Sequence, residues 1–199
     1  LRLRLPAHAE SDPGVALKRA AAFAAILYGF LEAGLVAVLA AIALEHWHAR
    51  VETVFIVLIL AAAPASLFWG WLIDKIGGRA TLLTIFVVFS IFETLLLAAR
   101  ALFPASAHAY IAAAVFGVAA GGIYPAGFAW LVEGCPPSRY GYASGLFTRA
   151  YGLGSLFGPL CFGIAIEGAG EKGFFALALA LGLMGIAWSI RPSKVAGAP

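Results

Sequence analysis

Charged side chains are scarce in this sequence. Aspartate, glutamate, lysine and arginine make up 12% of the 199 residues, whereas hydrophobic residues make up 63%. Soluble domains carry about 25% charged residues, because most of a protein surface must be solvated by water. This composition therefore excludes a water-soluble globule and favours a chain whose solvent is partly lipid.

Cysteine is almost absent, and the two that occur, Cys135 and Cys161, fall in an expected loop and an expected membrane span. No disulfide framework is therefore predicted.

His46 and His48 flank Trp47 without a third ligand and are interpreted as solvated loop residues, not as a metal site. The sequence also lacks a phosphate loop, a nucleophile elbow, a zinc-protease helix and a nucleotide fingerprint. With a net charge of only +3, we expect no enzyme, cofactor, metal, ATP-driven step or nucleic-acid partner.

Long apolar runs are what the sequence contains instead. A membrane-spanning helix needs about 20 mainly apolar residues, and continuous runs without period-two alternation indicate helices and not barrel strands. The sequence predicts an all-α, polytopic membrane bundle of six transmembrane helices, at residues 20–44, 53–73, 81–99, 109–132, 144–166 and 174–190.

Lysine and arginine are divided unequally between the two sides that these spans define. Ten of the 13 lie on one side, and cytosolic loops are the ones enriched in these residues. Both termini are therefore expected in the cytosol. The five tryptophans fall near span ends, which fits an interfacial belt. The ten are Arg2, Arg4, Lys18, Arg19, Lys75, Arg79, Arg139, Arg149, Arg191 and Lys194; Arg50, Arg100 and Lys172 lie on the other side.

Polar segments flank the six expected spans. Residues 1–19 are interpreted as a cytosolic linker or tail, residues 20–190 as one transmembrane domain, and residues 191–199 as a cytosolic C-terminal tail. The chain begins at Leu1, and no three-part signal peptide precedes its first apolar run. We therefore expect the chain to be a segment of a longer protein.

The expected loop between the second and third spans, residues 70–83, reads GWLIDKIGGRATLL. Gly77 and the glycine after it allow a tight backbone turn. Asp74 is suited to the positive end of a helix dipole, and Arg79 can pair with a carboxylate or a lipid phosphate. An ordinary basic turn that follows the positive-inside rule is the alternative interpretation.

This loop resembles the signature G-x-L-(a)-D-(r/k)-x-G-(r/k)-(r/k), which lies between the second and third helices of a half of a major facilitator superfamily transporter. Gly78 departs from the signature where a second basic residue is usual, which weakens one expected cytosolic charge contact. The resemblance covers residues 20–190 and is nearest to the C-terminal six-helix half in a poorly characterised bacterial branch. The matching residues are Gly70, Leu72, Asp74, Lys75, Gly77 and Arg79.

The resemblance implies two three-helix repeats in inverted topology, a bacterial cytoplasmic membrane, and a conformational-switch role for the signature loop. Residues 149–163, RAYGLGSLFGPLCFG, are similar to the G-x-x-x-G-P pattern of the family's fifth helix. Gly154 and Gly158 share a helix face, so a neighbouring helix can pack closely there. Pro159 removes a backbone hydrogen bond and can bend the helix.

Glu32 lies about 12 residues into the first expected span, which places it roughly 18 Å deep, near the middle of a hydrocarbon core of about 30 Å. Ionised residues at that depth cost roughly 2.5 to 3.5 kcal/mol on insertion scales, so Glu32 should face a cavity or a partner. Tyr28 lies one turn away on the same face. We expect both residues on the substrate or proton path. A protonated glutamate that hydrogen-bonds a neighbouring helix is the alternative.

Further candidates lie in later spans. Tyr124 would border the cavity if the family's helix arrangement holds. Arg149, about five residues into the fifth expected span, is a candidate to bind an anionic substrate; snorkelling to the cytosolic interface and pairing with Glu133 are the alternatives. Glu93 is interpreted as a structural or partner-contact residue, because the third helix of each half is peripheral in the family.

These patterns predict secondary active transport of a small solute by alternating access, with proton coupling through Glu32 as a hypothesis. A non-transporting six-span scaffold, a regulatory subunit or a degenerate half-transporter is the alternative. The expected partners are the lipid bilayer, a small-molecule substrate, and either a missing N-terminal half or a second copy of the chain. In the homodimer, Asp74 would approach residues 144–145 of the other copy.

Overall fold

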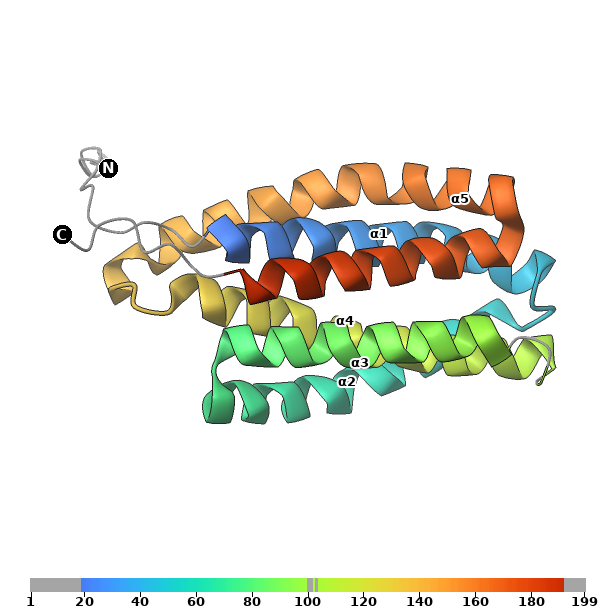
Figure 1. The fold of residues 1–199 in the computed structure, drawn as a ribbon, viewed down its shortest axis with the longest axis horizontal. Helices are drawn as coiled ribbons and strands as arrows, with labels where there is room; N and C mark the ends of the chain where they lie inside the picture. The colour runs from blue at the N-terminus through green and yellow to red at the C-terminus, as the bar shows by residue number, and fades with distance from the viewer. Residues whose placement is uncertain (1–18, 100–101, 103, 192–199) are drawn as a thin grey trace, which may run out of the picture.

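The computed structural model describes residues 19–99, 102 and 104–191, so the predicted linker and tail lie almost entirely outside it. The described residues are helical and contain no strand, which confirms the predicted all-α class. The helices run along one long axis as a bundle (Figure 1). They are α1 (Arg19–Glu45), α2 (Val51–Ile76), α3 (Gly78–Ala98), α4 (Ala105–Val132), the short 3-10 helix η2 (Pro137–Arg139) and α5 (Tyr140–Ile190).

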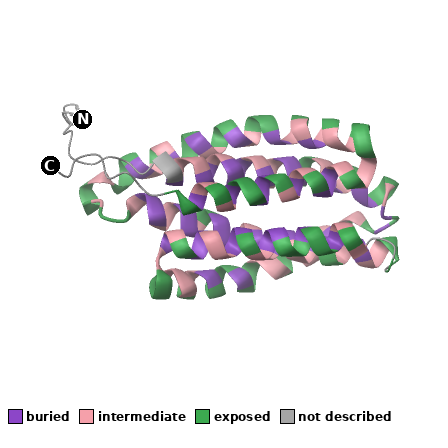
Figure 2. Cartoon of the chain, viewed as in Figure 1, coloured by how far each residue is buried: buried purple, intermediate pink, exposed green. Residues whose placement is uncertain are grey.

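The outer surface of the bundle is apolar. All five α-helices are long and apolar enough to cross a membrane. Large hydrophobic side chains point outward from them, including Leu67, which is 79% exposed, and Leu156, which is 69% exposed. Exposed positions run the full length of the bundle (Figure 2). Soluble monomers rarely expose contiguous apolar surface of this extent, so the chain is a multi-pass membrane protein.

The last two expected spans form a single element, α5, which is 51 residues long. Its backbone leaves the helical region at Gly170, with φ 59° and ψ −143°, and the chain reverses direction there (Figure 1). Glycine adopts a positive φ readily because it has no Cβ. In the described residues the structure therefore has five helices of membrane-spanning length where the sequence predicted six, because one glycine replaces the loop expected at residues 167–173.

Glycines set the distance between α1 and the first arm of α5. A Cβ at Gly154 would lie 2.7 Å from the backbone nitrogen of Phe30, and one at Gly158 would lie 2.9 Å from that of Gly34. Both separations are too short for non-bonded carbon and nitrogen atoms, so a side chain at either position would force the helices to move. The two backbones are therefore in direct contact over more than one helical turn.

A second pair of glycines has the same effect between α4 and α2. A Cβ at Gly117 would lie 3.0 Å from the Cβ of Ala61, and one at Gly121 would lie 3.2 Å from the backbone nitrogen of Ser66. Small residues at helix interfaces let membrane helices approach closely, since lipid supplies no hydrophobic force between them. The bundle is thus built on two close helix pairs, α1 with α5 and α2 with α4.

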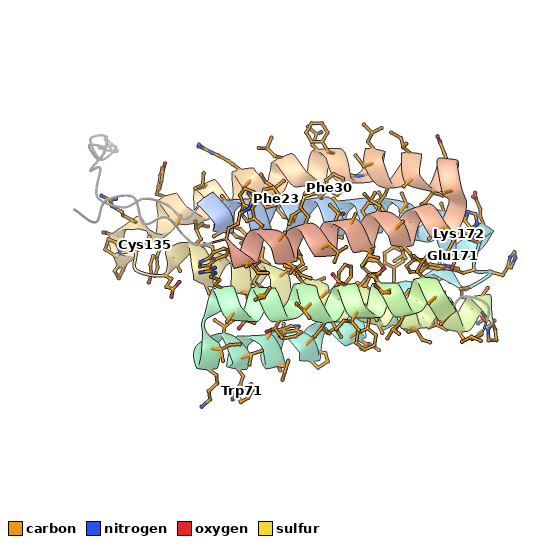
Figure 3. The ribbon with its side chains drawn as sticks, in the orientation of Figure 1. Phe23, Phe30, Trp71, Cys135, Glu171 and Lys172 are labelled. Carbon is orange, nitrogen blue, oxygen red and sulfur yellow. The ribbon has the colours of Figure 1, made fainter. Side chains whose placement is uncertain are left out.

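Most of the tryptophans pack inside the bundle and do not form the interfacial belt that the sequence predicted. Trp47 is fully buried against Phe174 and Phe175. Trp69 and Trp130 are 4% and 1% exposed. By contrast, the side chain of Trp71 projects away from α2 into the surroundings (Figure 3). Position near a span end therefore did not reveal which way each indole points.

We predict opposite effects of alanine at two neighbouring glycines of α5. Gly154→Ala should destabilise the protein by about 1–3 kcal/mol, because the new methyl group overlaps the α1 backbone. Gly152→Ala meets nothing within 4 Å and should stabilise the helix by up to about 1 kcal/mol. Thermal unfolding of both variants in one detergent measures the difference. Equal stability would contradict the close α1–α5 contact.

Candidate functional site

A carboxyl group and a tyrosine meet across the interface between α1 and the first arm of α5. The hydroxyl of Tyr151, on α5, donates a hydrogen bond of 2.8 Å to Glu32 Oε2, on α1. The two residues are 119 positions apart in the chain. Gly29, one turn before Glu32, lies against the α5 backbone, and a Cβ there would be 2.9 Å from Ser155 Oγ. Close packing of the two helices therefore places the tyrosine on the glutamate.

Three tyrosine rings gather around this hydrogen bond. The ring centroid of Tyr28 lies 5.5 Å from that of Tyr151 and 5.9 Å from that of Tyr124. Tyr28 is 9% exposed, whereas Tyr124 is 40% exposed. The structure thus brings together Glu32, Tyr28 and Tyr124, which the sequence singled out. It adds Tyr151, which the sequence analysis missed although this residue lies three positions before Gly154.

A small cavity of ≈ 70 Å³ opens beside the tyrosine cluster. Glu32 and Tyr28 form part of its wall, and every other lining side chain is apolar. The walls come from α1, α2, α3 and α4, and Val36 in the wall is exposed, so the cavity lies between these helices and opens to the surface of the bundle. Its apolar lining consists of Leu31, Leu35, Val36, Leu58, Phe89, Phe116, Ala119, Ala120 and Ile123.

Arg149 does not join this cluster. It is exposed, and residues two positions apart on an α-helix point about 200° apart. Its side chain therefore projects from the side of α5 that is nearly opposite to Tyr151. Glu171 and Lys172 also lie away from the tyrosine cluster, at the end of the bundle where α5 reverses direction (Figure 3).

The signature loop is a tight turn between α2 and α3. Gly77 ends α2 with a φ of 82°, a conformation that favours glycine. At Gly78 a Cβ would lie 2.5 Å from the backbone nitrogen of Trp130, on α4. The basic residue that is usual at this position in the signature cannot fit here, which explains the departure seen in the sequence. Asp74 and Lys75 are exposed, and Gly70 has open space around its Cα.

Arg79 links the start of α3 to the end of α5. Its Nε donates to the carbonyl of Ser189 at 2.8 Å, and its terminal nitrogen donates to those of Ile190 and Arg191 at 3.0 Å each. The guanidinium also lies 5.8 Å from the ring centroid of Trp130. A cation is favourable at a helix C-terminus, where carbonyl groups lack partners. The contacts of Arg79 with the described residues are therefore to a helix end and not to a carboxylate.

Glu93 is fully buried in α3. It is 0% exposed, and neither carboxylate oxygen has a hydrogen-bond partner among the described residues. Ser90, one turn earlier on the same helix, is buried without a partner for its hydroxyl in the same part of the chain. A carboxylate that is ionised and unpaired in such a place is very costly. Glu93 is thus placed for neither lipid nor partner contact.

Comparison with known proteins identifies the family. The sequence model described as "Major Facilitator Superfamily" matches residues 21–199. Two relatives, from two strains of Mycobacterium tuberculosis, are each described as "Probable nitrate/nitrite transporter NarK2". Each is 39% identical to this chain over 114 residues, which is 54% of this chain and 27% of the relative. The chain therefore spans about a quarter of the length of these relatives.

We predict that Arg79→Ala loosens the end of α5. Loss of the hydrogen bonds to three carbonyl groups should speed amide hydrogen exchange in the last turn of α5 and cost about 1 kcal/mol of stability, since the site is partly exposed to solvent. Lys75→Ala, at an exposed position of the same loop, is the control and should change neither quantity. An unchanged exchange rate in Arg79→Ala would contradict the role assigned to these bonds.

We also predict that Glu93→Leu stabilises the protein. A leucine of similar volume removes a buried polar group that has no partner among the described residues, which is worth about 1 kcal/mol. Glu32→Leu is the matched comparison and should destabilise, because it leaves the hydroxyl of Tyr151 without its acceptor. Thermal unfolding in detergent compares the two variants. A clear loss of stability in Glu93→Leu would show that Glu93 has a partner.

Proposed function

This chain belongs to the Major Facilitator Superfamily, and on that premise we propose that it forms the C-terminal six-span half of a secondary transporter. In this proposal the half moves a small solute by alternating access, with Glu32 as the proton-carrying residue. The observation that carries it is the Tyr151–Glu32 hydrogen bond of 2.8 Å, which sits beside an apolar cavity inside a membrane bundle. Ionisable residues within membrane spans usually mark ion or substrate pathways.

The proposed transmembrane domain comprises residues 20–190 in six spans. The reversal at Gly170 supports this count, because it divides α5 into two arms that are each long enough to cross a bilayer. Two inverted three-helix repeats would place Pro64 of α2 and Pro159 of α5 in equivalent helices.

Both ends of the chain are proposed to lie in the cytosol of a bacterial cell. The unequal division of lysine and arginine supports this orientation. The packing agrees with it, because the rings of Phe23, near the start of α1, and Trp188, near the end of α5, lie 4.1 Å apart. The first and last spans therefore begin and end on the same side of the membrane.

Proton binding at Glu32 would change the contact between α1 and α5. An ionised carboxylate accepts a stronger hydrogen bond from the Tyr151 hydroxyl than a neutral carboxyl group does. A proton that reaches Glu32 from the aqueous side thus weakens a contact between two helices that border the cavity. In this scheme protonation alters the relative stability of two arrangements of the half, which is how a ligand shifts a conformational equilibrium.

A partner is proposed to complete the transporter, either an N-terminal half or a second copy of this chain. Exposed apolar side chains on α2 and on the first arm of α5 support this, among them Phe68 and Leu160. Asp74 is exposed near the cytosolic end of α2. It is free to meet the N-terminal end of a fifth span in the partner, near residues 144–145 in a homodimer.

We predict that Glu32→Gln abolishes proton movement that depends on solute. Proteoliposomes that contain the chain and a trapped pH-sensitive dye would receive nitrate, nitrite or choline, one at a time. The wild-type chain should show solute-dependent proton flux with at least one of them, and Glu32→Gln should reduce it by at least tenfold. Glu45→Gln, an exposed carboxyl at the end of the same helix, is the control and should retain the flux.

Two outcomes of this experiment contradict the proposal. Solute flux with the same pH dependence in wild type and Glu32→Gln would end the assignment of Glu32 as the proton carrier. No flux of any of the three solutes, from a chain whose mass in detergent is that of a dimer, would favour the non-transporting scaffold.

A further inference from the structure

A long apolar groove follows α3 and α4 along the outside of the bundle. Its volume is ≈ 430 Å³, against ≈ 70 Å³ for the cavity beside Glu32. On α3 the lining residues run from Ile85 to Phe92, and on α4 they run from Ile111 to Ala119. Within each stretch they recur at spacings of three and four, which places them on one face of each helix. The groove therefore runs parallel to the helices and across the membrane.

The two ends of the groove differ. At one end the indole of Trp69, from α2, covers Gly122 of α4, where a Cβ would lie 2.6 Å from Trp69 Cγ and 2.6 Å from Ile85 Cδ1. At the other end, Phe92 and Ile111 are both exposed on the outer surface. The groove is thus closed at the Trp69 end and open at the end that Phe92 and Ile111 form.

The walls of the groove offer nothing to a polar ligand. No charged side chain lines it in the part of the chain that the structure describes. The indole Nε1 of Trp69 already donates a hydrogen bond of 2.8 Å to the carbonyl of Val118. A bound water needs two to four polar partners, so water is a poor occupant. Atoms that line a void lose dispersion contacts, so the groove is better filled by an apolar group.

The groove is too narrow for another helix. From Ile111 to Ala119 it extends about 12 Å, at 1.5 Å per residue. A volume of ≈ 430 Å³ divided by that length gives a mean cross-section of about 36 Å². A helix with its side chains is about 10 to 12 Å across, which corresponds to roughly 80 to 110 Å². A single unbranched alkyl chain matches the groove better than a helix of a partner protein does.

The groove also lies away from the surfaces proposed to meet a partner. On α2, Phe68 belongs to those surfaces, and its side chain points about 100° away from that of the adjacent Trp69. Leu160 belongs to them as well, and the first arm of α5 contributes none of the described residues that line the groove. The rim at Phe92 and Ile111 is part of the apolar outer surface, where the solvent is lipid. Membrane lipid therefore has access to this groove.

We propose that one acyl chain of a membrane lipid occupies the groove as a bound ligand. The chain enters between Phe92 and Ile111, and its methyl end lies toward Trp69. Phe89 and Ala119 line both the groove and the cavity beside Glu32, so the bound chain packs against residues that also form the cavity wall. A ligand stabilises the arrangement of the protein to which it binds. The lipid thus favours the arrangement of α3 and α4 in which Phe89 closes the cavity.

The test uses tryptophan fluorescence, because bromine atoms quench an indole only at short range. The chain would be placed in nanodiscs of phosphatidylcholine mixed with rising fractions of the same lipid brominated toward the methyl ends of its acyl chains. The difference between wild type and Trp69→Phe isolates the signal of Trp69. The difference between wild type and Trp71→Phe isolates that of Trp71, whose side chain is exposed on the surface of α2.

The two tryptophans should respond differently. One chain reaches Trp69, so its quenched fraction should rise in direct proportion to the fraction of brominated lipid. Several chains surround Trp71, so its signal should fall more steeply at low fractions. Ala114→Phe fills the middle of the groove and should reduce the quenching of Trp69 at least threefold while that of Trp71 is unchanged. Ala180→Phe, at an exposed position of α5, is the matched control and should behave as the wild type does.

Native mass spectrometry of the chain in detergent measures whether the lipid is bound or only passes by. The wild type and Ala180→Phe should each retain one lipid that Ala114→Phe lacks. Equal retention in all three would overturn the groove as the binding site. No quenching of Trp69 would show that protein covers the groove, and equally steep quenching of Trp69 and Trp71 would show bulk lipid contact only; either result overturns the proposal, even if Ala114→Phe does not fold. None of these measurements involves transport, so their failure leaves the proposed function intact.

Discussion

Direct contact between the backbones of α1 and α5 is the constraint on which the candidate site depends. Gly154 and Gly158 on α5, and Gly29 and Gly34 on α1, leave no room for a Cβ between the two helices. The phenol of Tyr151 is long enough to reach Glu32 only because the helices are this close. The same residues that lower the packing distance in lipid therefore also create the polar contact, and fold and site cannot be altered independently.

Most of the architecture could be predicted from the sequence, because each membrane helix is marked by a long apolar run. Each of the first four expected spans lies within or almost within one observed helix. The last two did not separate as expected, since Gly170 reverses the chain without a loop of its own. Residues 167–173 contain three glycines, and the sequence gives no sign of which one adopts a positive φ. The form of this turn could therefore be found only from the structure.

The site was only partly predictable, and for a physical reason. Glu32 is recognisable because a carboxyl group at mid-membrane depth is expensive wherever it occurs. The hydrogen bond from Tyr151 to Glu32 depends on how α5 is rotated and shifted along α1. The residue pattern of a single helix does not determine that arrangement. Gly78 also required the structure. In the sequence it is only a departure from a basic motif, and the structure shows that α4 packs so close to Gly78 that no side chain fits there. For Glu93 the sequence left a structural role and a partner contact open, and only the faces of α3 show that the residue is buried inside the bundle.

The reversal at Gly170 leaves very little polypeptide outside the helices at that end of the bundle. A Cβ at Gly173 would already overlap the backbone of Ala165, so the two arms of α5 are joined without slack. An epitope tag or protease site inserted between them would have to unwind a helical turn before it could be displayed. The connection between α1 and α2, at residues 46–50, exposes His48 and Arg50 at the same end of the bundle, so reagents that act from that side of the membrane can reach these two side chains.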